Sequence, residues 1–182
     1  MRPKCQSSHR AFSLVELVIV IVIIGVIAAI AVPRVSRGAK GAGDSAVKGD
    51  LSALRSAIDL YAAEHNGAFP GLHKDNGSES SNGGEADFIA QLTEYSAVNG
   101  ETGAHDPAAT PPLIYGPYLR NGMPPLPVGV NAGNAEVKFD KTNSPPQVAE
   151  GNGRGWMYNS ETGEIIANTT ATDESGKPYS EY

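Results

Sequence analysis

The chain has 182 residues, 40% of them hydrophobic, and carries a formal net charge of −6. A chain of this length has room for one ordinary domain and a membrane segment, and its acidic balance argues against nucleic-acid binding, which needs a basic surface. The single cysteine, Cys5, precedes the main apolar segment, so the rest of the chain can form no disulfide of its own.

A long apolar segment near the N-terminus follows a short basic one. Three basic residues and no acidic residue occur among the first eleven: Arg2, Lys4 and Arg10. From Phe12 to Val32 the clearly polar side chains are Ser13 and Glu16. About 20 helical residues cover roughly 30 Å, which is the thickness of the hydrocarbon core of a bilayer. The positive-inside rule then predicts a cytoplasmic N-terminus, with everything after Val32 across the membrane.

Three interpretations of this segment compete. A secretory signal peptide would be cut after a small-residue site such as Ala28–Ala31, but the apolar segment is too long for one. A plain single-span anchor explains the length and leaves Glu16 without a purpose, although a carboxylate at the bilayer centre costs about 2.5–3.5 kcal/mol. The third interpretation is cleavage before the apolar segment, between Ala11 and Phe12, which leaves the whole hydrophobic helix on the mature protein.

The residues around this point, Arg10-Ala11-Phe12-Ser13-Leu14-Val15-Glu16-Leu17, resemble the processing site of type IV prepilins and type II secretion pseudopilins. The resemblance implies that a prepilin peptidase cuts between Ala11 and Phe12 and that the new N-terminal Phe12 is N-methylated. It also places Glu16 at the fifth mature position, where the family has Glu. Ala11 stands where the family usually has Gly, so the small side chain is kept.

Cleavage at this site would also give Glu16 a partner. The α-amine of Phe12 has an ordinary pKa of about 8 and would lie at the start of a helix. If helices stack with an axial offset, the carboxylate of one copy meets the amine of the next, which offsets the burial of both charges. A head-to-tail contact of this kind generates an open helical filament. Phe12 and Glu16 are therefore the predicted assembly residues.

The sequence predicts three regions: a cleaved leader over 1–11, a transmembrane and assembly half of a long helix over 12–43, and a periplasmic globular domain over 44–182. One helix is expected from Phe12 to about His65, bent near Pro33 and loosened near Gly41. Its second half carries an apolar stripe with steps of four and three residues: Val47, Leu51, Leu54, Ile58 and Tyr61. Gly67 is expected to form a left-handed cap.

The rest of the domain is expected to be rich in loops. A loop over 70–84 precedes a short helix, Phe88 to Tyr95, capped by Asp87, and a second loop runs to Pro112. The proline-rich stretch that follows is expected to pack through Tyr115 and Tyr118 within the chain; the alternative is a ligand for another protein.

Strands are expected late in the chain. One is predicted over 135–139, and a hairpin is predicted from 155–159 and 164–168. Trp156 and Ile165 or Ile166 should close the core, and the tail after Thr169 is expected to be loose. The predicted fold class is α+β, a long N-terminal helix that continues into a globular domain and packs on a small antiparallel sheet.

The order of these elements resembles the major pseudopilin, or G-type, family. The matching residues are Tyr61, Asn66-Gly67, Phe69-Pro70, Gly116-Pro117-Tyr118-Leu119 and Trp156-Met157-Tyr158. The resemblance implies a structural subunit of the bacterial inner membrane that polymerises into a pseudopilus. Its implied partners are other copies of itself, the prepilin peptidase, the inner-membrane secretion platform and minor pseudopilins. Alternatives are a type IV pilus subunit or minor pilin serving adhesion, motility or DNA uptake, and a membrane-anchored periplasmic enzyme or binding protein.

No cofactor is expected from the residues. The three histidines beyond the leader, His65, His73 and His105, show no metal-ligand spacing, and no nucleophile motif marks an enzyme. Major pseudopilins typically bind calcium in a C-terminal loop. Asp173 and Glu174 are the candidates for such a site in this tail, and the acidic-glycine ending of the family is missing.

Overall fold

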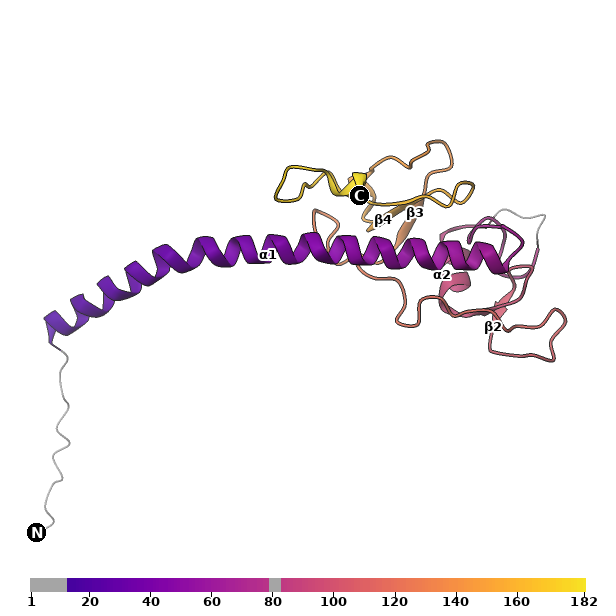
Figure 1. Ribbon diagram of the computed structural model, residues 1–182, viewed down its shortest axis with the longest axis horizontal. Helices are drawn as coiled ribbons and strands as arrows, with labels where there is room; N and C mark the ends of the chain where they lie inside the picture. The colour runs from indigo at the N-terminus through magenta and orange to yellow at the C-terminus, as the bar shows by residue number, and fades with distance from the viewer. Residues whose placement is uncertain (1–12, 79–82) are drawn as a thin grey trace, which may run out of the picture. The chain divides into compact units, whose positions relative to one another are not determined.

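The computed structural model describes residues 13–78 and 83–182, with the side chains of 32–39 outside the description. The chain forms two compact units, Met1–Lys40 and Gly41–Tyr182. Helices and short strands occur together, so the α+β class predicted from the sequence is confirmed (Figure 1). The predicted cleavage residues Ala11 and Phe12 lie outside the described residues.

The long helix α1 runs from Leu14 to Glu64. The loosening expected near Gly41 was wrong, because the backbone there is α-helical and the Gly41 carbonyl also accepts a hydrogen bond from Ser45 Oγ at 3.0 Å. The helix ends with left-handed backbone, but the cap position predicted for Gly67 is occupied by Asn66 (φ +55°), and Gly67 follows it. Gly67 has φ +83°, and its N–H donates to the Ala62 carbonyl at 2.8 Å, which is the closing bond of a Schellman cap.

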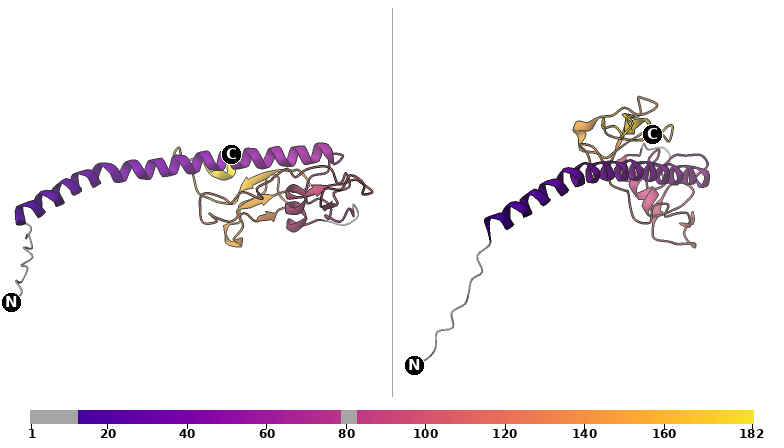
Figure 2. Two further views of the ribbon diagram at one scale, coloured as in Figure 1. Left: turned by 90° about the horizontal axis from the view of Figure 1, so that it is seen from below. Right: turned by 60° about the vertical axis from the view of Figure 1, so that its left-hand side comes forward.

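The second unit is organised around the part of α1 that belongs to it. The predicted stripe is confirmed, since Val47, Leu51, Leu54, Ile58 and Tyr61 are each no more than 2% exposed. Buried side chains of α2 and of the small sheet join this stripe in one core. The left view of Figure 2 shows both elements on the same side of α1. The other large members of the core are Phe88, Leu92, Leu126, Val137, Trp156, Tyr158, Ile165 and Tyr179.

Helix α2 covers Glu85–Thr93, so it begins and ends earlier than predicted. Asp87 is not the N-cap residue. It occupies the third helical position, from which its Oδ2 accepts the N–H of Gly84 at 2.6 Å and its Oδ1 accepts the N–H of Asp75 at 3.0 Å. Tyr95, expected at the end of this helix, instead starts strand β1 (Tyr95–Ser96), which pairs with β2 (Thr102–Gly103).

The second sheet has the order β3-β4-β5 and contains the predicted strand and hairpin. Strands β4 (Trp156–Tyr158) and β5 (Ile165–Ala167) pair antiparallel, and the turn between them ends at Gly163 with φ +75°. Strand β3 (Val137–Phe139) joins β4 in parallel, so the sheet is mixed. A side chain at Gly163 would collide with the Phe69 ring, because a Cβ there would lie 2.4 Å from it.

Two short 3₁₀ helices complete the fold, η1 (Glu150–Asn152) and η2 (Tyr179–Glu181). The prediction of a loose tail was wrong. Tyr179 is buried, its hydroxyl donates to Asp44 of α1, and its N–H donates to the Ala171 carbonyl at 3.1 Å. The tail therefore packs on α1 through specific contacts that its polar composition did not reveal.

Candidate functional site

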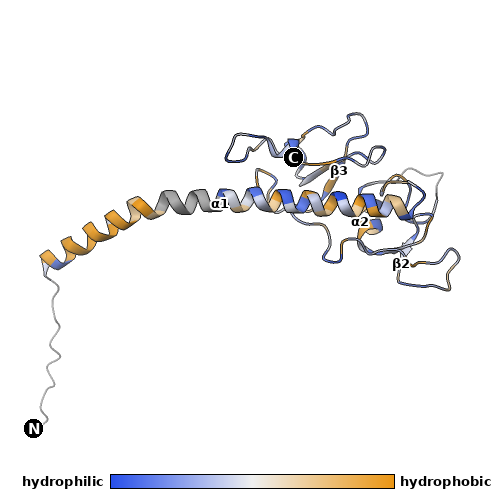
Figure 3. Ribbon diagram, in the orientation of Figure 1, coloured by the Kyte–Doolittle hydropathy of each residue, from blue (hydrophilic) through white to orange (hydrophobic). Residues whose placement is uncertain are grey.

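The N-terminal part of α1 exposes an unusually continuous apolar surface. Residues Leu14–Ala31 form a segment long and apolar enough to cross a membrane, and none of it is buried within the chain (Figure 3). Its large side chains are 44% to 78% exposed. Burying one such side chain is worth about 1.5–3 kcal/mol, so water cannot be the stable environment of this surface. Lipid or another apolar surface would remove these side chains from water.

Glu16 is the one ionisable residue of this segment. It lies in the first turn of α1, where the N–H groups and the helix dipole favour a negative charge. The ion pairs among the described residues are Lys138–Glu85 and Arg154–Glu136, so Glu16 has no charged partner in that part of the chain. A carboxylic acid that leaves water with this surface would have to be neutralised, either by protonation or by a cation from outside the described residues.

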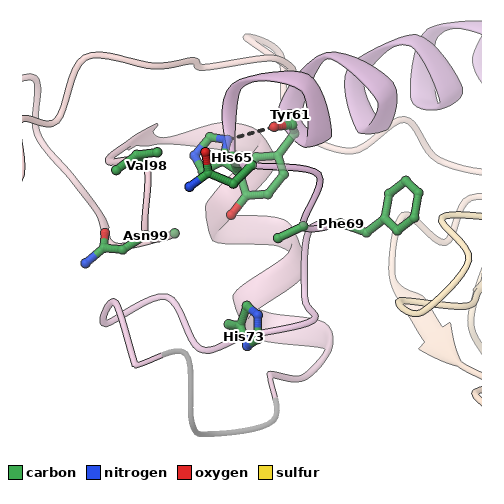
Figure 4. A pocket seen from close by; sticks show the side chains of 9 residues that line it. Tyr61, His65, Phe69, His73, Val98 and Asn99 are labelled. Atoms are coloured by element: carbon green, nitrogen blue, oxygen red, sulfur yellow. Dashed lines mark hydrogen bonds between the residues drawn. The ribbon is translucent and has the colours of Figure 1, made fainter.

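A second group of polar residues lies at the other end of α1, around His65. The imidazole is 2% exposed and stacks on Tyr61 with ring centroids 3.7 Å apart (Figure 4). Its Nδ1 lies 2.7 Å from the Tyr61 carbonyl, which can only accept, so Nδ1 carries the proton. Its Nε2 therefore accepts from the Ser96 hydroxyl at 3.0 Å.

The environment of His65 favours the neutral ring. Burial lowers its pKa below the ordinary value, and this effect outweighs the Tyr61 hydrogen bond and the nearby Glu64 charge, which both favour protonation. Glu64 itself accepts a hydrogen bond from the Tyr118 hydroxyl at 2.5 Å. Tyr118 and Tyr115 both contact the His65 ring edge-on, so the predicted packing of these two tyrosines within the chain is confirmed.

The pair of Ser96 and His65 was not predicted, because 31 residues separate them and no motif surrounds either one. A serine that is hydrogen-bonded to a histidine is the central pair of many nucleophilic active sites, because the histidine can act as the base. Here the Ser96 side chain is fully buried, and the neighbouring cavity of about 200 Å³ is lined by residues such as Phe69, His73 and Asn99 (Figure 4). A substrate carbonyl has no approach to Ser96, so the pair is a structural contact.

Asp173 and Glu174, the calcium candidates expected in the tail, differ in their contacts. Asp173 Oδ1 accepts the N–H groups of Ser175 and Lys177, both at 2.8 Å, and the Ser175 hydroxyl at 2.7 Å. Its Oδ2 accepts the Tyr182 hydroxyl, and these hydrogen bonds hold the pKa of Asp173 below its ordinary value. Glu174 is exposed and contributes only its N–H, to Asp44 at 3.3 Å.

Cations of the chain already surround this loop. The ammonium groups of Lys48 and Lys177 lie 4.7 and 4.8 Å from the centre of the Tyr182 ring. Calcium needs six to eight oxygen ligands, and within residues 13–78 and 83–182 no group of three acidic, histidine or cysteine side chains is arranged to hold a metal. The Asp173 carboxylate is engaged by hydrogen-bond donors of the tail itself.

Comparison with known proteins bears on the N-terminal segment. Residues 6–32 match the family described as the prokaryotic N-terminal methylation motif. No curated protein and no solved structure matches the chain significantly. The match contains the predicted cleavage and methylation residues Ala11 and Phe12, and also Glu16. The methylation motif and the exposed apolar helix together support a type IV pilin-like subunit, processed by a prepilin peptidase, anchored in a membrane by α1 and assembled into a filament.

Proposed function

We propose that the protein is the major structural subunit of a type II secretion pseudopilus. The observation that carries the proposal is Glu16, a lone exposed carboxylate on an apolar helix that bears the methylation motif. The type II assignment is supported by the resemblance of Gly116–Leu119 and Trp156–Tyr158 to the major pseudopilins. The absence of cysteine after Cys5 also supports it, because many type IV pilins close their C-terminal region with a disulfide.

In this proposal the apolar half of α1 serves in two successive environments. Before assembly it spans the inner membrane, with the N-terminus in the cytoplasm and residues 44–182 in the periplasm. After cleavage between Ala11 and Phe12, Glu16 of one subunit pairs with the methylated Phe12 amine of its neighbour. The same apolar side chains then pack against those of other copies, and polymerisation on the secretion platform, with minor pseudopilins, drives export.

The proposal is tested first by the intact mass of the mature protein. We expect the loss of residues 1–11 and the gain of one methyl group on Phe12. Cleavage near Ala31, or no cleavage, would contradict it and favour an ordinary secreted or anchored protein. Deletion of the gene should then block protein export; loss of twitching motility or of DNA uptake, with export intact, would assign the subunit to a type IV pilus instead.

We further propose that the tail closes without calcium, because the protein's own donors occupy Asp173. The melting temperature of the detergent-solubilised protein should be the same with excess calcium as with a chelator. Asp173→Ala should lower it in both conditions, whereas Glu174→Ala, a matched removal of an exposed acid, should leave it unchanged. A melting temperature that rises with calcium in the native protein and not in Asp173→Ala would contradict this expectation.

A further inference from the structure

The cavity beside His65 contains a buried hydroxyl group that no described residue satisfies. Tyr61 is 2% exposed, and its ring stacks on His65 and meets the ring of Tyr118 edge-on at 5.6 Å, so its position is fixed. The hydroxyl makes no hydrogen bond with any described residue, and burial raises the pKa of this phenol, so it stays a donor at neutral pH. A buried donor without an acceptor is costly, so a molecule from outside the chain is expected to accept its hydrogen bond.

This hydroxyl opens into the cavity. Its oxygen is not sealed within the core, and Tyr61 is one of the residues that line the space of about 200 Å³. Figure 4 shows the hydroxyl pointing away from α1, toward the side on which His73 lies. Asn66, which also lines the cavity, is exposed, so the space is open to solvent. At about 30 Å³ for each water, it has room for about six or seven water molecules, or for one sugar ring.

Two further polar side chains of the lining have no hydrogen-bond partner among the described residues. They are the imidazole of His73, in the loop after α1, and the amide of Asn66, just beyond the end of that helix. A neutral imidazole and an amide can each donate and accept, and a phenol hydroxyl can do the same. The cavity therefore offers three groups that suit a ligand with both donors and acceptors, which is the property of a hydroxyl group.

The lining carries no fixed charge. No Asp, Glu, Lys or Arg is among the described residues that line the cavity, and Ala68 and Val98 add apolar surface. A carboxylate or an ammonium group that entered would lose hydration without meeting an opposite charge, which is unfavourable. A neutral molecule with several hydroxyl groups on a carbon frame matches both the polar and the apolar parts of the lining.

We propose that this cavity binds a neutral polyhydroxylated ligand of the size of one sugar residue. A hydroxyl oxygen of the ligand accepts the hydrogen bond of Tyr61, other hydroxyl groups pair with His73 and Asn66, and the carbon frame lies against Ala68 and Val98. The site uses no residue of the apolar segment Leu14–Ala31, so it is independent of the filament function proposed above.

Saturation-transfer NMR of the full chain, in a detergent without a sugar headgroup, tests the site with glucose as the probe. The native protein should transfer magnetisation to the glucose protons. Tyr61→Phe removes only the unpaired hydroxyl and should weaken glucose binding at least about fivefold, or about 1 kcal/mol. Tyr115→Phe removes a hydroxyl from a ring that contacts His65 without lining the cavity, and it should bind glucose as the native protein does.

The melting temperature separates a lost contact from a lost fold. Because the Tyr61 hydroxyl has no partner among the described residues, Tyr61→Phe should melt at the native temperature, so its weaker binding reports on the ligand. Charged analogues of the probe test the neutral lining. Glucuronate and glucosamine should both bind more weakly than glucose, because neither charge meets an opposite one in the cavity.

Three results would overturn the site. They are no transfer to glucose, which would leave the cavity to water alone, equal glucose binding by the native protein and Tyr61→Phe, and binding of either charged analogue as tight as that of glucose. Maltotriose identifies the source of the ligand. Tighter binding than glucose would assign the site to a residue of a saccharide chain, and exclusion would assign it to a free sugar; both results support the site. Each of these measurements is made without filaments, so the site can fail while the proposed function stands.

Discussion

Replacement of Glu16 by Ala is expected to abolish filament assembly while leaving cleavage, methylation and membrane insertion intact. The carboxylate is unfavourable in the bilayer, where a charged side chain at the centre costs about 2.5–3.5 kcal/mol. Its removal therefore cannot weaken the insertion of the helix into the membrane. What the variant would lose is the proposed partner of the Phe12 amine in the filament core. Assembly is measured as sheared or pelleted filaments, and processing as the intact mass of the membrane-bound subunit.

Two companion variants separate charge from packing at this position. Glu16→Gln keeps the size and the hydrogen-bonding capacity of the side chain and removes only its charge, so it should fail to assemble as completely as Glu16→Ala. Val20→Ala, one turn further along the same exposed apolar surface, should assemble. Normal filaments from Glu16→Ala would show that the pairing of Glu16 with Phe12 does not hold subunits together.

The parts of the fold that the sequence predicted are those set by local pattern. The apolar stripe from Val47 to Tyr61 follows from the helical period, and the turn at Gly163 follows from the conformational freedom of glycine. The capping residue of α2 was misplaced because Gly84 and Asp87 both suit the start of a helix. A single sequence gives little basis for choosing between an N-cap aspartate and one at the third helical position.

Contacts between distant segments account for most of what the sequence did not predict. Nothing in residues 135–139 indicates that β3 joins β4 in parallel, because the packing of the whole core determines which strand β3 pairs with. The tail looked loose because it is polar, yet its tyrosines reach Asp44 and Asp173. Both segments are positioned by contacts with distant residues of the folded chain, and the amino-acid composition of a segment does not reveal such contacts.

Only part of the candidate site, likewise, could be predicted from the sequence. Glu16 could be identified from the sequence because a carboxylate within an apolar run is anomalous by itself. The contact of Ser96 with His65 could not, because the two residues are 31 positions apart and meet only in the folded chain.

His65 is expected to make the globular unit less stable in mild acid. Its pKa is lowered in the folded protein by burial, whereas in the unfolded chain it titrates near its ordinary value of about 6.5. Its contribution to stability is therefore complete above that value and is lost as the pH falls toward the folded pKa. The free energy of unfolding should fall with a slope of at most about 1.4 kcal/mol per pH unit from this one group.

Urea unfolding of the detergent-solubilised protein, followed by the fluorescence of the buried Trp156, measures this slope from about pH 7.5 down to about pH 5. His65→Gln offers a donor and an acceptor without titrating, so it should be less stable at neutral pH and show a flatter pH profile. His105→Gln removes an exposed histidine and should keep the native profile.

The carboxylates that accept hydrogen bonds, such as Asp140 and Asp173, have lowered pKa values and lose their contribution to stability only at lower pH. An equal slope in the native protein and in His65→Gln would therefore place the acid sensitivity elsewhere and contradict the burial of a neutral His65.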